Sequence, residues 1–435
     1  MGRQRAVELS LLLIVGIITC AAYTLVGLGE NASLPANIGP FLGFTLAMLA
    51  LAHIAIRRLA PTADGSLFPI AALLNGIGFV FVARLDKDLA GLQATWTMVG
   101  IAAFVATLAI VRDVRDLARY RYMLALAGIG LLMLPLLPYF GRTINGARLW
   151  LRVGSFTIQP GEFAKIALAI FFASYLVEKR ELLALATRRI GPLHVPDPKH
   201  LGPLLLAWAA SLVVMVFERD LGSSLLFFTL FLVMLWIATA RSAYLIAGGG
   251  LFMVGALASW RMFTHVQTRV STWLDPWADV TGDGYQLAQS TFALSSGGII
   301  GSGPGLGSPE RIPAAKTDFI FSVIGEELGM VGATAVLSAY LLMVGIGLRI
   351  ATRAHDNVET LLAAGLTTII GVQAFLIIGG ILRVLPLTGI TLPFVSYGGS
   401  SLVANYVLLA LLLRISNSSA PPASQLLFKD AKAAS

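Results

Sequence analysis

The stretch LGSSLLFFTLFLVMLWIATA, residues 221–240, runs for twenty residues without a charged side chain. A helix of about 20 apolar residues crosses the ~30 Å hydrocarbon core of a bilayer. Similar runs recur along almost the whole chain, which has 435 residues, 57% of them hydrophobic and only 12% charged. Soluble proteins carry roughly 25% charged residues. The sequence therefore predicts an all-α, polytopic integral membrane protein and excludes an ordinary soluble enzyme.

Apolar runs separated by polar breaks predict about twelve membrane-spanning helices in one transmembrane domain, residues 1–415, followed by a cytoplasmic tail, residues 416–435. We expect the spans near residues 10–29, 38–56, 67–83, 92–111, 122–140, 162–178, 202–217, 221–240, 242–260, 320–348, 359–382 and 400–414. The opening MGRQR has no small-residue cleavage pattern after it, which favours a retained first helix over a signal peptide. Positive residues near span ends resist translocation, and the distribution of Lys and Arg among the loops places both termini in the cytoplasm.

Several chemistries are disfavoured by the residue counts. The single cysteine, Cys20, allows no internal disulfide and no cysteine metal cluster. The five histidines are scattered without paired spacing, so a histidine-bound zinc is not expected. The net charge of +8 is explained by basic cytoplasmic loops, and no nucleic-acid partner is expected.

The longest polar stretch, residues 261–318, is expected on the outer side of the membrane and carries Asp275 and Asp279 on either side of a Pro-Trp corner. A carboxylate sheltered from bulk water there would have a raised pKa and could act as a base. The two carboxylates could also bind a divalent cation, since hard cations prefer oxygen ligands. Residues 285–300 have helix-like apolar spacing, and they could equally form an interfacial helix without chemistry.

A second polar segment, residues 145–165, leads directly into a predicted span. Glu162 and Lys165 are three residues apart and share a helix face, which should point into the bundle because charge facing lipid is costly. The pair either binds helices together or sets a field for a substrate. Arg148 and Arg152 flank Trp150, a pattern that fits either interfacial anchoring or capture of a phosphorylated headgroup.

Two further segments are unusual. The turn FERDLGSS, residues 217–224, is charged, although this is a weak signal because charged turns are common. The stretch LPLTGITLPFVSYGGSS, residues 385–401, is too apolar for an exposed loop and too rich in Pro and Gly for a helix. Irregular backbone at membrane depth occurs only where protein buries it or where it lines a cavity. We therefore expect a re-entrant segment that lines a substrate site.

Taken together, these segments resemble the SEDS family (shape, elongation, division and sporulation). The matching stretches are NGARLWLRVGSFTIQPGEFAK, DLGSS, DPWADVTGDGYQLAQS, SSGGIIGSGPGLGS, TDFIFSVIGEELGMVGA and LPLTGITLPFVSYGGSS. They cover about residues 140–415, which leaves extra spans within residues 1–140. The chain is more similar to the RodA group of actinobacteria than to the FtsW group, although FERDLGSS replaces the Gln-Pro-Asp-Leu-Gly run of many members.

The resemblance implies a peptidoglycan glycosyltransferase of the bacterial cytoplasmic membrane. Such an enzyme polymerises lipid II, a disaccharide-pentapeptide on undecaprenyl pyrophosphate, at the outer face for cell-wall elongation and cell shape, with a class B penicillin-binding protein as partner. Asp279 matches the catalytic aspartate of the family. The expected substrate-binding residues are Arg148, Glu162, Lys165, Asp275, Gln286, Gln289, Ser396, Tyr397 and Ser400. A divalent cation, Mg or Mn, is a possible cofactor, and no organic cofactor is expected.

The expected mechanism is single displacement with inversion, which gives a β-1,4 link from an α-linked donor. Asp279 would remove the proton of the acceptor 4-hydroxyl, while Arg148 and Lys165 offset the charge of the departing pyrophosphate. Three alternatives remain: a lipid II flippase or transporter, a division-type polymerase like FtsW, and a non-catalytic scaffold for the transpeptidase. A transporter should show inverted repeats or paired broken helices, and only residues 385–401 are clearly broken.

Overall fold

The fold is a bundle of long helices with two small antiparallel sheets. The computed structural model describes residues 2–35, 37–137, 141–144, 147–154, 156–185, 187–190, 193–196, 209–210 and 220–419. The helices up to residue 185 are α1 (Gly2–Asn31), α2 (Ile38–Leu59), α3 (Leu67–Leu85), α4 (Lys87–Ile110), α5 (Arg115–Ala118), α6 (Arg121–Met133), η1 (Leu134–Leu136), α7 (Gly161–Glu178) and α8 (Arg180–Leu185). The later helices are α10 (Leu221–Thr239), α11 (Ser242–Met262), α12 (Thr264–Leu274), α13 (Tyr285–Gly297), η3 (Pro309–Arg311), α14 (Ile320–Arg353), α15 (Asn357–Ile381) and α16 (Gly399–Ser418).

Most of the predicted spans are confirmed as helices. In the part of the chain that the structure describes, nine helices are long and apolar enough to cross a membrane. Two further predicted spans correspond to α6 and to α7, whose Glu162 and Lys165 make it less apolar. The predicted span 202–217 lies outside the described residues, apart from the helical residues 209–210, and so does most of the predicted tail 416–435. The all-α polytopic fold class is therefore confirmed.

The outer segment is more ordered than the sequence suggests. The stretch expected as a polar loop before α7 forms a sheet of β1 (Gly141–Ile144), β2 (Ala147–Val153) and β3 (Phe156–Ile158), in the order β1-β2-β3. In this sheet Arg142 pairs with Trp150, and Arg152 pairs with Thr157. A second hairpin joins β4 (Thr187–Ile190) to β5 (Leu193–Pro196). A helix is present within 285–300 as α13, and α12 precedes it without having been predicted.

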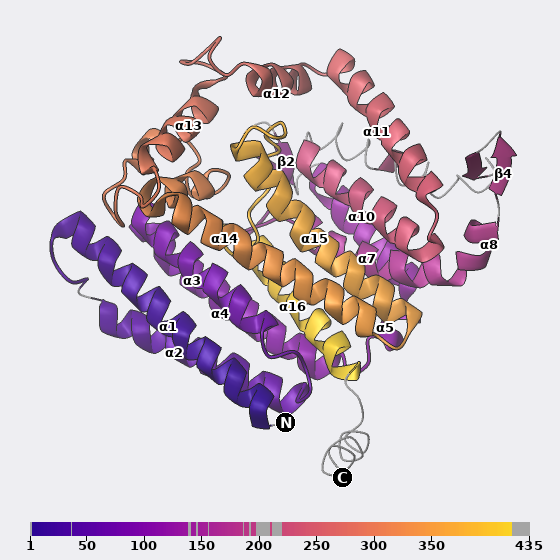
Figure 1. The fold of residues 1–435 in the computed structure, drawn as a ribbon, viewed down its shortest axis with the longest axis horizontal. Helices are drawn as coiled ribbons and strands as arrows, with labels where there is room; N and C mark the ends of the chain where they lie inside the picture. Colours follow the sequence, from indigo (N-terminus) through magenta and orange to yellow (C-terminus); the bar gives the residue numbers. More distant parts are fainter. Residues whose placement is uncertain are drawn as a thin grey trace.

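The ends of the bundle can be followed in Figure 1. Helix α1 begins and α16 ends at the same end, whereas α12 and α13 lie at the opposite end, above α14 and α15. Long helices pack side by side, with α16 against α4, α14 against α15, and α6 against α7. We refer to the end that carries α12 and α13 as the outer end, following the orientation inferred from the basic loops.

Aspartate residues are the N-caps of several of the long helices. Asp86 accepts hydrogen bonds from the backbone N–H groups of Asp88 and Leu89 at the start of α4. Asp220 accepts one from Ser223 at the start of α10. Such N-caps satisfy backbone donors that have no partner inside the helix. The first turns of these outer-end helices are therefore fixed by side chains.

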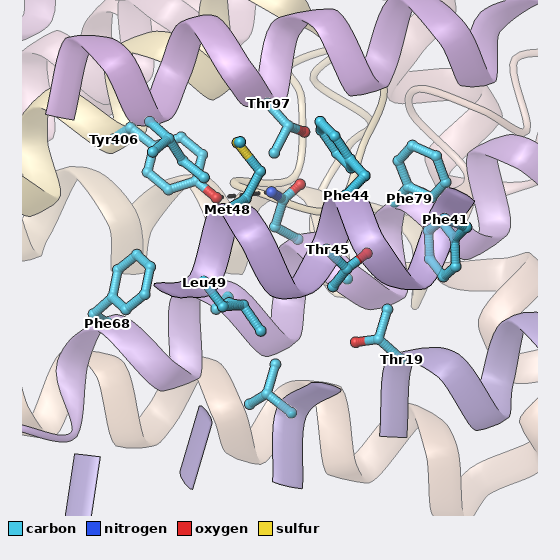
Figure 2. Close-up of a pocket in the computed structure, with 15 residues that line it drawn as sticks. Thr19, Phe41, Phe44, Thr45, Met48, Leu49, Phe68, Phe79, Thr97 and Tyr406 are labelled. Atoms are coloured by element: carbon cyan, nitrogen blue, oxygen red, sulfur yellow. Dashed lines mark hydrogen bonds between the residues drawn. The ribbon is translucent and has the colours of Figure 1, made fainter. Parts of the chain in front are cut away.

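Helices α1 and α2 form an N-terminal hairpin that packs on α3 and α4. Figure 2 shows the cavity at this junction, lined by mostly aromatic and apolar side chains of α1, α2, α3, α4 and α16. Asn75 donates a hydrogen bond of 2.7 Å to the buried hydroxyl of Tyr406 there. Within the hairpin, Glu8 is buried and contacts both His53, at 2.9 Å, and Arg57. The hairpin thus has its own internal charge pairing.

Residues 385–398 contain no helix, in agreement with the prediction of a re-entrant segment. Ser396 and Val395 in this segment are buried. The segment passes so close to α3 that a Cβ atom on Gly78 would lie 2.4 Å from the Val395 carbonyl oxygen. A glycine is therefore required at position 78, and this contact positions α3 against the irregular backbone.

We expect Gly78→Ala to lower the melting temperature of the purified protein, because the added methyl group overlaps backbone atoms that cannot move independently. Overpacking of this kind costs about 1–3 kcal/mol. The matched control is Gly43→Ala on α2, where an added Cβ meets nothing within 4 Å. Equal melting temperatures for the two variants, measured by thermal denaturation in detergent, would contradict the close approach.

Candidate functional site

The turn between α12 and α13 is built around the carboxylate of Asp279. Its Oδ1 accepts the N–H of Gly282 at 3.0 Å, and its Oδ2 accepts the N–H of Asp283 at 3.0 Å. A Cβ atom on Gly282 would lie 2.1 Å from Oδ2, so a larger residue there would displace this carboxylate. The side chain is exposed. Asp279 is therefore held in one orientation and faces outward.

The exposure of this turn corrects one expectation. The sequence suggested that Asp275 and Asp279 are sheltered from bulk water, but both side chains are exposed. Asp275 accepts the N–H of Trp277 at 3.0 Å, and Trp277 contacts the ring of Phe292 on α13, with 5.5 Å between ring centroids. The corner is held by these local contacts rather than by burial. In this structure, desolvation is not what would prepare Asp279 as a base.

Two glutamines of α13 follow the turn. Gln286 lies in the first turn of α13 and is exposed. Gln289 lies in the second turn and is half-buried. Among the described residues, no group of three His, Cys, Asp or Glu side chains is arranged to hold a metal ion. Asp275 and Asp279 are two of the three carboxylates in this turn, and they could contribute oxygen ligands to a cation held jointly with a substrate.

The predicted pair of Glu162 and Lys165 is present near the start of α7. The ammonium of Lys165 donates to Glu162 Oε2 at 2.5 Å and to Gln373 Oε1 of α15 at 3.0 Å. Only 1% of Lys165 and 7% of Glu162 is exposed. The pair points into the bundle as expected, and Gln373 is a partner that sequence reasoning missed because it lies on a distant helix.

We expect Lys165→Met to destabilise the protein strongly, because it leaves the Glu162 carboxylate buried without a cation. Breaking a buried pair in this way costs about 3–5 kcal/mol. The double variant Glu162→Gln/Lys165→Met removes both charges and should recover most of the loss in melting temperature. A double variant as unstable as Lys165→Met alone would show that the pair does not act as a unit.

The three-stranded sheet joins α6 to α7 at the outer end. Arg148 lies in β2 and donates a hydrogen bond of 3.0 Å to the carbonyl of Leu137. Beyond β3, the backbone N–H of Gln159 donates to Ser400 Oγ at 2.8 Å. The sheet is thereby tied to the start of α16.

Hydrogen bonds hold the predicted site residues of the re-entrant segment in place. Ser396 donates to the carbonyl of Thr317 at 2.5 Å and accepts the N–H of Leu392 at 3.0 Å. The backbone N–H of Tyr397 donates to the carbonyl of Lys316 at 2.9 Å. Ser396 and Ser400 are buried. These hydroxyl groups therefore join the re-entrant segment to its neighbours.

A charged cluster that the sequence did not single out lies around Gly389. The guanidinium of Arg269, on α12, donates to the Leu387 carbonyl at 2.7 Å. A Cβ atom on Gly389 would lie 3.5 Å from Arg269 Nη2 and 3.9 Å from Asp318 Oδ2. Burial raises the pKa of Asp318 to about 6, and a hydrogen bond with Thr317 and the charge of Arg269 partly oppose this change. Burial likewise raises the pKa of Asp220, and its hydrogen bonds with Ser223 oppose this change.

We expect Asp318→Asn to raise the melting temperature relative to the unchanged protein, and this gain should widen from pH 5 to pH 7.5. Because the folded-state pKa of about 6 lies above the ordinary value, the ionised carboxyl destabilises the fold, fully above pH 6 and less as pH falls. The control Asp283→Asn removes an exposed carboxylate of the same outer segment. A gain that stays constant with pH would contradict this assignment.

An apolar cavity of about 190 Å³ lies below this cluster, between α10, α11 and α12. Its lining includes Phe228, Phe252 and Val266, and Thr388 closes it near Gly389. The outer end of the bundle thus offers an exposed carboxylate, the buried cation of Lys165, the half-buried cations of Arg148 and Arg269, and an apolar cavity. Within the described part of the chain, no hydrogen bond or ion pair joins Asp279 to Arg148 or to Lys165. The structure brings Lys165 to Gln373 and Ser400 to Gln159, but it leaves the Asp279 turn apart from both.

These features define a multi-pass membrane protein with a polar site at one membrane face. The chain matches the profile of the FtsW/RodA/SpoVE family, described as cell cycle protein, over residues 66–420, and it belongs to this family. The matched residues exclude the N-terminal hairpin α1–α2.

The relatives include peptidoglycan glycosyltransferase RodA of Mycobacterium tuberculosis, which is 46% identical over 430 residues, 96% of this chain and 92% of the relative. Probable peptidoglycan glycosyltransferase FtsW of Geobacter metallireducens is 33% identical over 344 residues, 78% of this chain and 85% of the relative. The expected similarity to the RodA group is therefore confirmed, and the chain is a peptidoglycan glycosyltransferase of a bacterial membrane.

Solved structures agree with this assignment. A chain from a peptidoglycan synthase complex that coordinates polymerization and crosslinking superimposes with a TM-score of 0.67 at 27% identity, covering 82% of this chain and 98% of that chain. A mutant of the rod shape determining protein RodA of Thermus thermophilus has a TM-score of 0.58 at 25% identity, covering 82% and 99%.

Proposed function

We propose that this protein polymerises lipid II into glycan strands for cell-wall elongation, at the outer membrane face and with Asp279 as the general base. The observation that carries the proposal is the turn that holds the Asp279 carboxylate exposed at the outer end. An exposed, fixed acceptor can receive the proton of an incoming hydroxyl group once a substrate covers it. Single displacement by that hydroxyl inverts the anomeric centre and gives a β-1,4 link.

The leaving pyrophosphate requires positive charge, because negative charge develops on it in the transition state. Arg148 is half-buried on β2, and its guanidinium has donors left beyond the one used for Leu137. Lys165 carries three donors, of which Glu162 and Gln373 occupy two. We therefore assign Arg148 to direct contact with the pyrophosphate, and Lys165 to the electrostatic field below it, with Glu162 orienting Lys165.

The remaining predicted residues divide into two groups. Asp275, Gln286 and Gln289 lie in or after the Asp279 turn with polar atoms available to a sugar. Ser396, Tyr397 and Ser400 position the re-entrant segment beneath the site through hydrogen bonds to backbone groups of neighbouring elements. The cavity between α10, α11 and α12 has an apolar lining that suits the isoprenoid chain of the carrier.

A divalent cation remains part of the proposal. Magnesium and manganese bind phosphate and carboxylate oxygens, and Asp275 and Asp279 would supply the protein ligands. We also propose cytoplasmic termini and a class B penicillin-binding protein as partner. The partner is supported by the similarity of this chain to one in a peptidoglycan synthase complex. The basic loops support the orientation.

We expect Asp279→Asn to abolish glycan formation from purified lipid II, because the amide cannot accept a proton while one side-chain oxygen still caps the turn. The matched control is Asp283→Ala in the same turn, which keeps the backbone N–H that Asp279 binds. The control should retain activity. Products would be separated on a gel, with and without Mg²⁺ or Mn²⁺ and with the partner present.

The outcomes separate the alternatives. Polymer from Asp279→Asn equal to that of the unchanged protein would overturn the assignment of the base. Transfer of labelled lipid II across proteoliposomes without any polymer would favour a flippase. Absence of both, with partner-dependent crosslinking preserved, would favour a scaffold.

A further inference from the structure

The N-terminal hairpin α1–α2 lies outside residues 66–420 of the family match, yet its outer end touches the glycine-rich stretch 298–308. A Cβ atom on Gly29 would lie 2.2 Å from the carbonyl oxygen of Pro304. A Cβ atom on Gly305 would lie 2.5 Å from the carbonyl oxygen of Val26. The two backbones therefore meet with no side chain between them, and each glycine is required by the other segment.

Arg84, at the end of α3, bridges the hairpin and the glycine-rich stretch. Its Nη1 lies 2.7 Å from Glu30 Oε1 of the hairpin, and its Nε lies 3.4 Å from Glu327 Oε1 of α14. Its Nη2 donates to the carbonyls of Gly305 and Gly307 at 3.3 and 3.4 Å. Glu327 is buried, and Arg84 and Glu30 are less than one-fifth exposed. One cation thus serves two carboxylates in a largely enclosed place.

The two glutamates at the start of α14 hold the same stretch from the other side. Glu327 Oε2 accepts the N–H of Gly305 at 2.7 Å, and Glu326 Oε1 accepts the N–H of Ser308 at 3.0 Å. The backbone carbonyl groups of Glu326 and Glu327 accept the N–H groups of Ser302 and Gly303. Residues 302–308 are therefore held between α14 and the hairpin by backbone and carboxylate hydrogen bonds.

Residues 302–308 follow shortly after the helix that begins at the end of the Asp279 turn. The N–H of Gly301 donates to the carbonyl of Gly297, the last residue of α13, at 2.7 Å. Earlier in α13, the hydroxyl of Ser290 shares a hydrogen bond of 2.6 Å with the hydroxyl of Ser322 on α14. A shift of residues 301–305 would therefore move the end of α13 and, through it, the Asp279 turn at its beginning.

We propose that Glu30 and Arg84 act as positioning residues for polymerisation: the hairpin presses on residues 301–305 and so fixes α13 and the Asp279 turn. The inference rests on the polymerase function proposed above. Neither residue touches the reacting atoms. Removal of the Arg84 side chain should have the larger effect, because it leaves Glu327 buried without a cation. Removal of the Glu30 charge leaves the Arg84–Glu327 pair in place.

The test uses the purified full-length protein and lipid II, with Glu30→Gln as the main variant. We expect turnover to fall by about tenfold, the effect of a barrier raised by one charge-assisted interaction, with the KM for lipid II unchanged. Glu30→Asp, which keeps the charge, should restore turnover. The melting temperature of Glu30→Gln should stay near that of the unchanged protein. The matched control is Asp88→Asn, an exposed carboxylate at the start of α4.

A second measurement is independent of lipid II. Hydrogen–deuterium exchange of the amides in residues 285–308 should be faster in Glu30→Gln than in Asp88→Asn, and normal in Glu30→Asp. Unchanged exchange, or normal turnover of Glu30→Gln, would overturn the positioning role. Absence of polymer from the unchanged protein, together with faster exchange in Glu30→Gln, would instead reject the proposed function and leave the mechanical coupling intact.

Discussion

The backbone of residues 385–398 forms no helix, so its polar groups need partners from other elements. The hydroxyl of Tyr340 on α14 donates to the Pro393 carbonyl at 2.6 Å, and Arg269 of α12 reaches the Leu387 carbonyl. Other bonds lead from this segment to residues 316–317. Because several elements form hydrogen bonds with this irregular segment, the arrangement of the outer end depends on residues 385–398. The requirement for glycine at position 78 follows from the same crowding.

Charge is scarce in this protein, and its placement separates two kinds of role. Lys165 and Glu162 are buried and form an ion pair with each other inside the bundle. Asp279 is exposed, and among the described residues its carboxylate accepts hydrogen bonds only from backbone N–H groups. Arg269 lies between these extremes, near two carboxyl groups with raised pKa values. The exposure of the charged side chains at the outer end therefore increases from the buried Lys165 to the exposed Asp279.

The sequence was sufficient for features that depend on local composition. Long apolar runs predicted the helices, the Pro/Gly/Ser pattern predicted the irregular segment, and the spacing of Glu162 and Lys165 predicted their pairing. The sheet was missed because β1 and β3 are only four and three residues long, too short for an alternating pattern to stand out.

Contacts over long separations were also beyond the reach of the sequence. Gln373 lies 208 residues from Lys165, and Arg269 lies 118 residues from Leu387, so no local pattern links them. The exposure of Asp279 depends on how α12 and α13 extend from the bundle, and this could not be read from neighbouring residues. The role of Arg148 came from the arginines that flank Trp150 together with the family resemblance, and the role of the α13 glutamines came from the resemblance. Both remain predictions.

The hairpin α1–α2 is fastened at both ends of the bundle. Its outer end meets Arg84, and at the inner end the Leu59 carbonyl accepts a hydrogen bond of 2.6 Å from Arg414. A short connection, residues 60–66, joins it to α3, so docking is intramolecular and proceeds at a high effective concentration. A hairpin with weak intrinsic affinity would thus remain almost fully docked. In thermodynamic terms the protein carries its own tethered subunit, which cannot be diluted away.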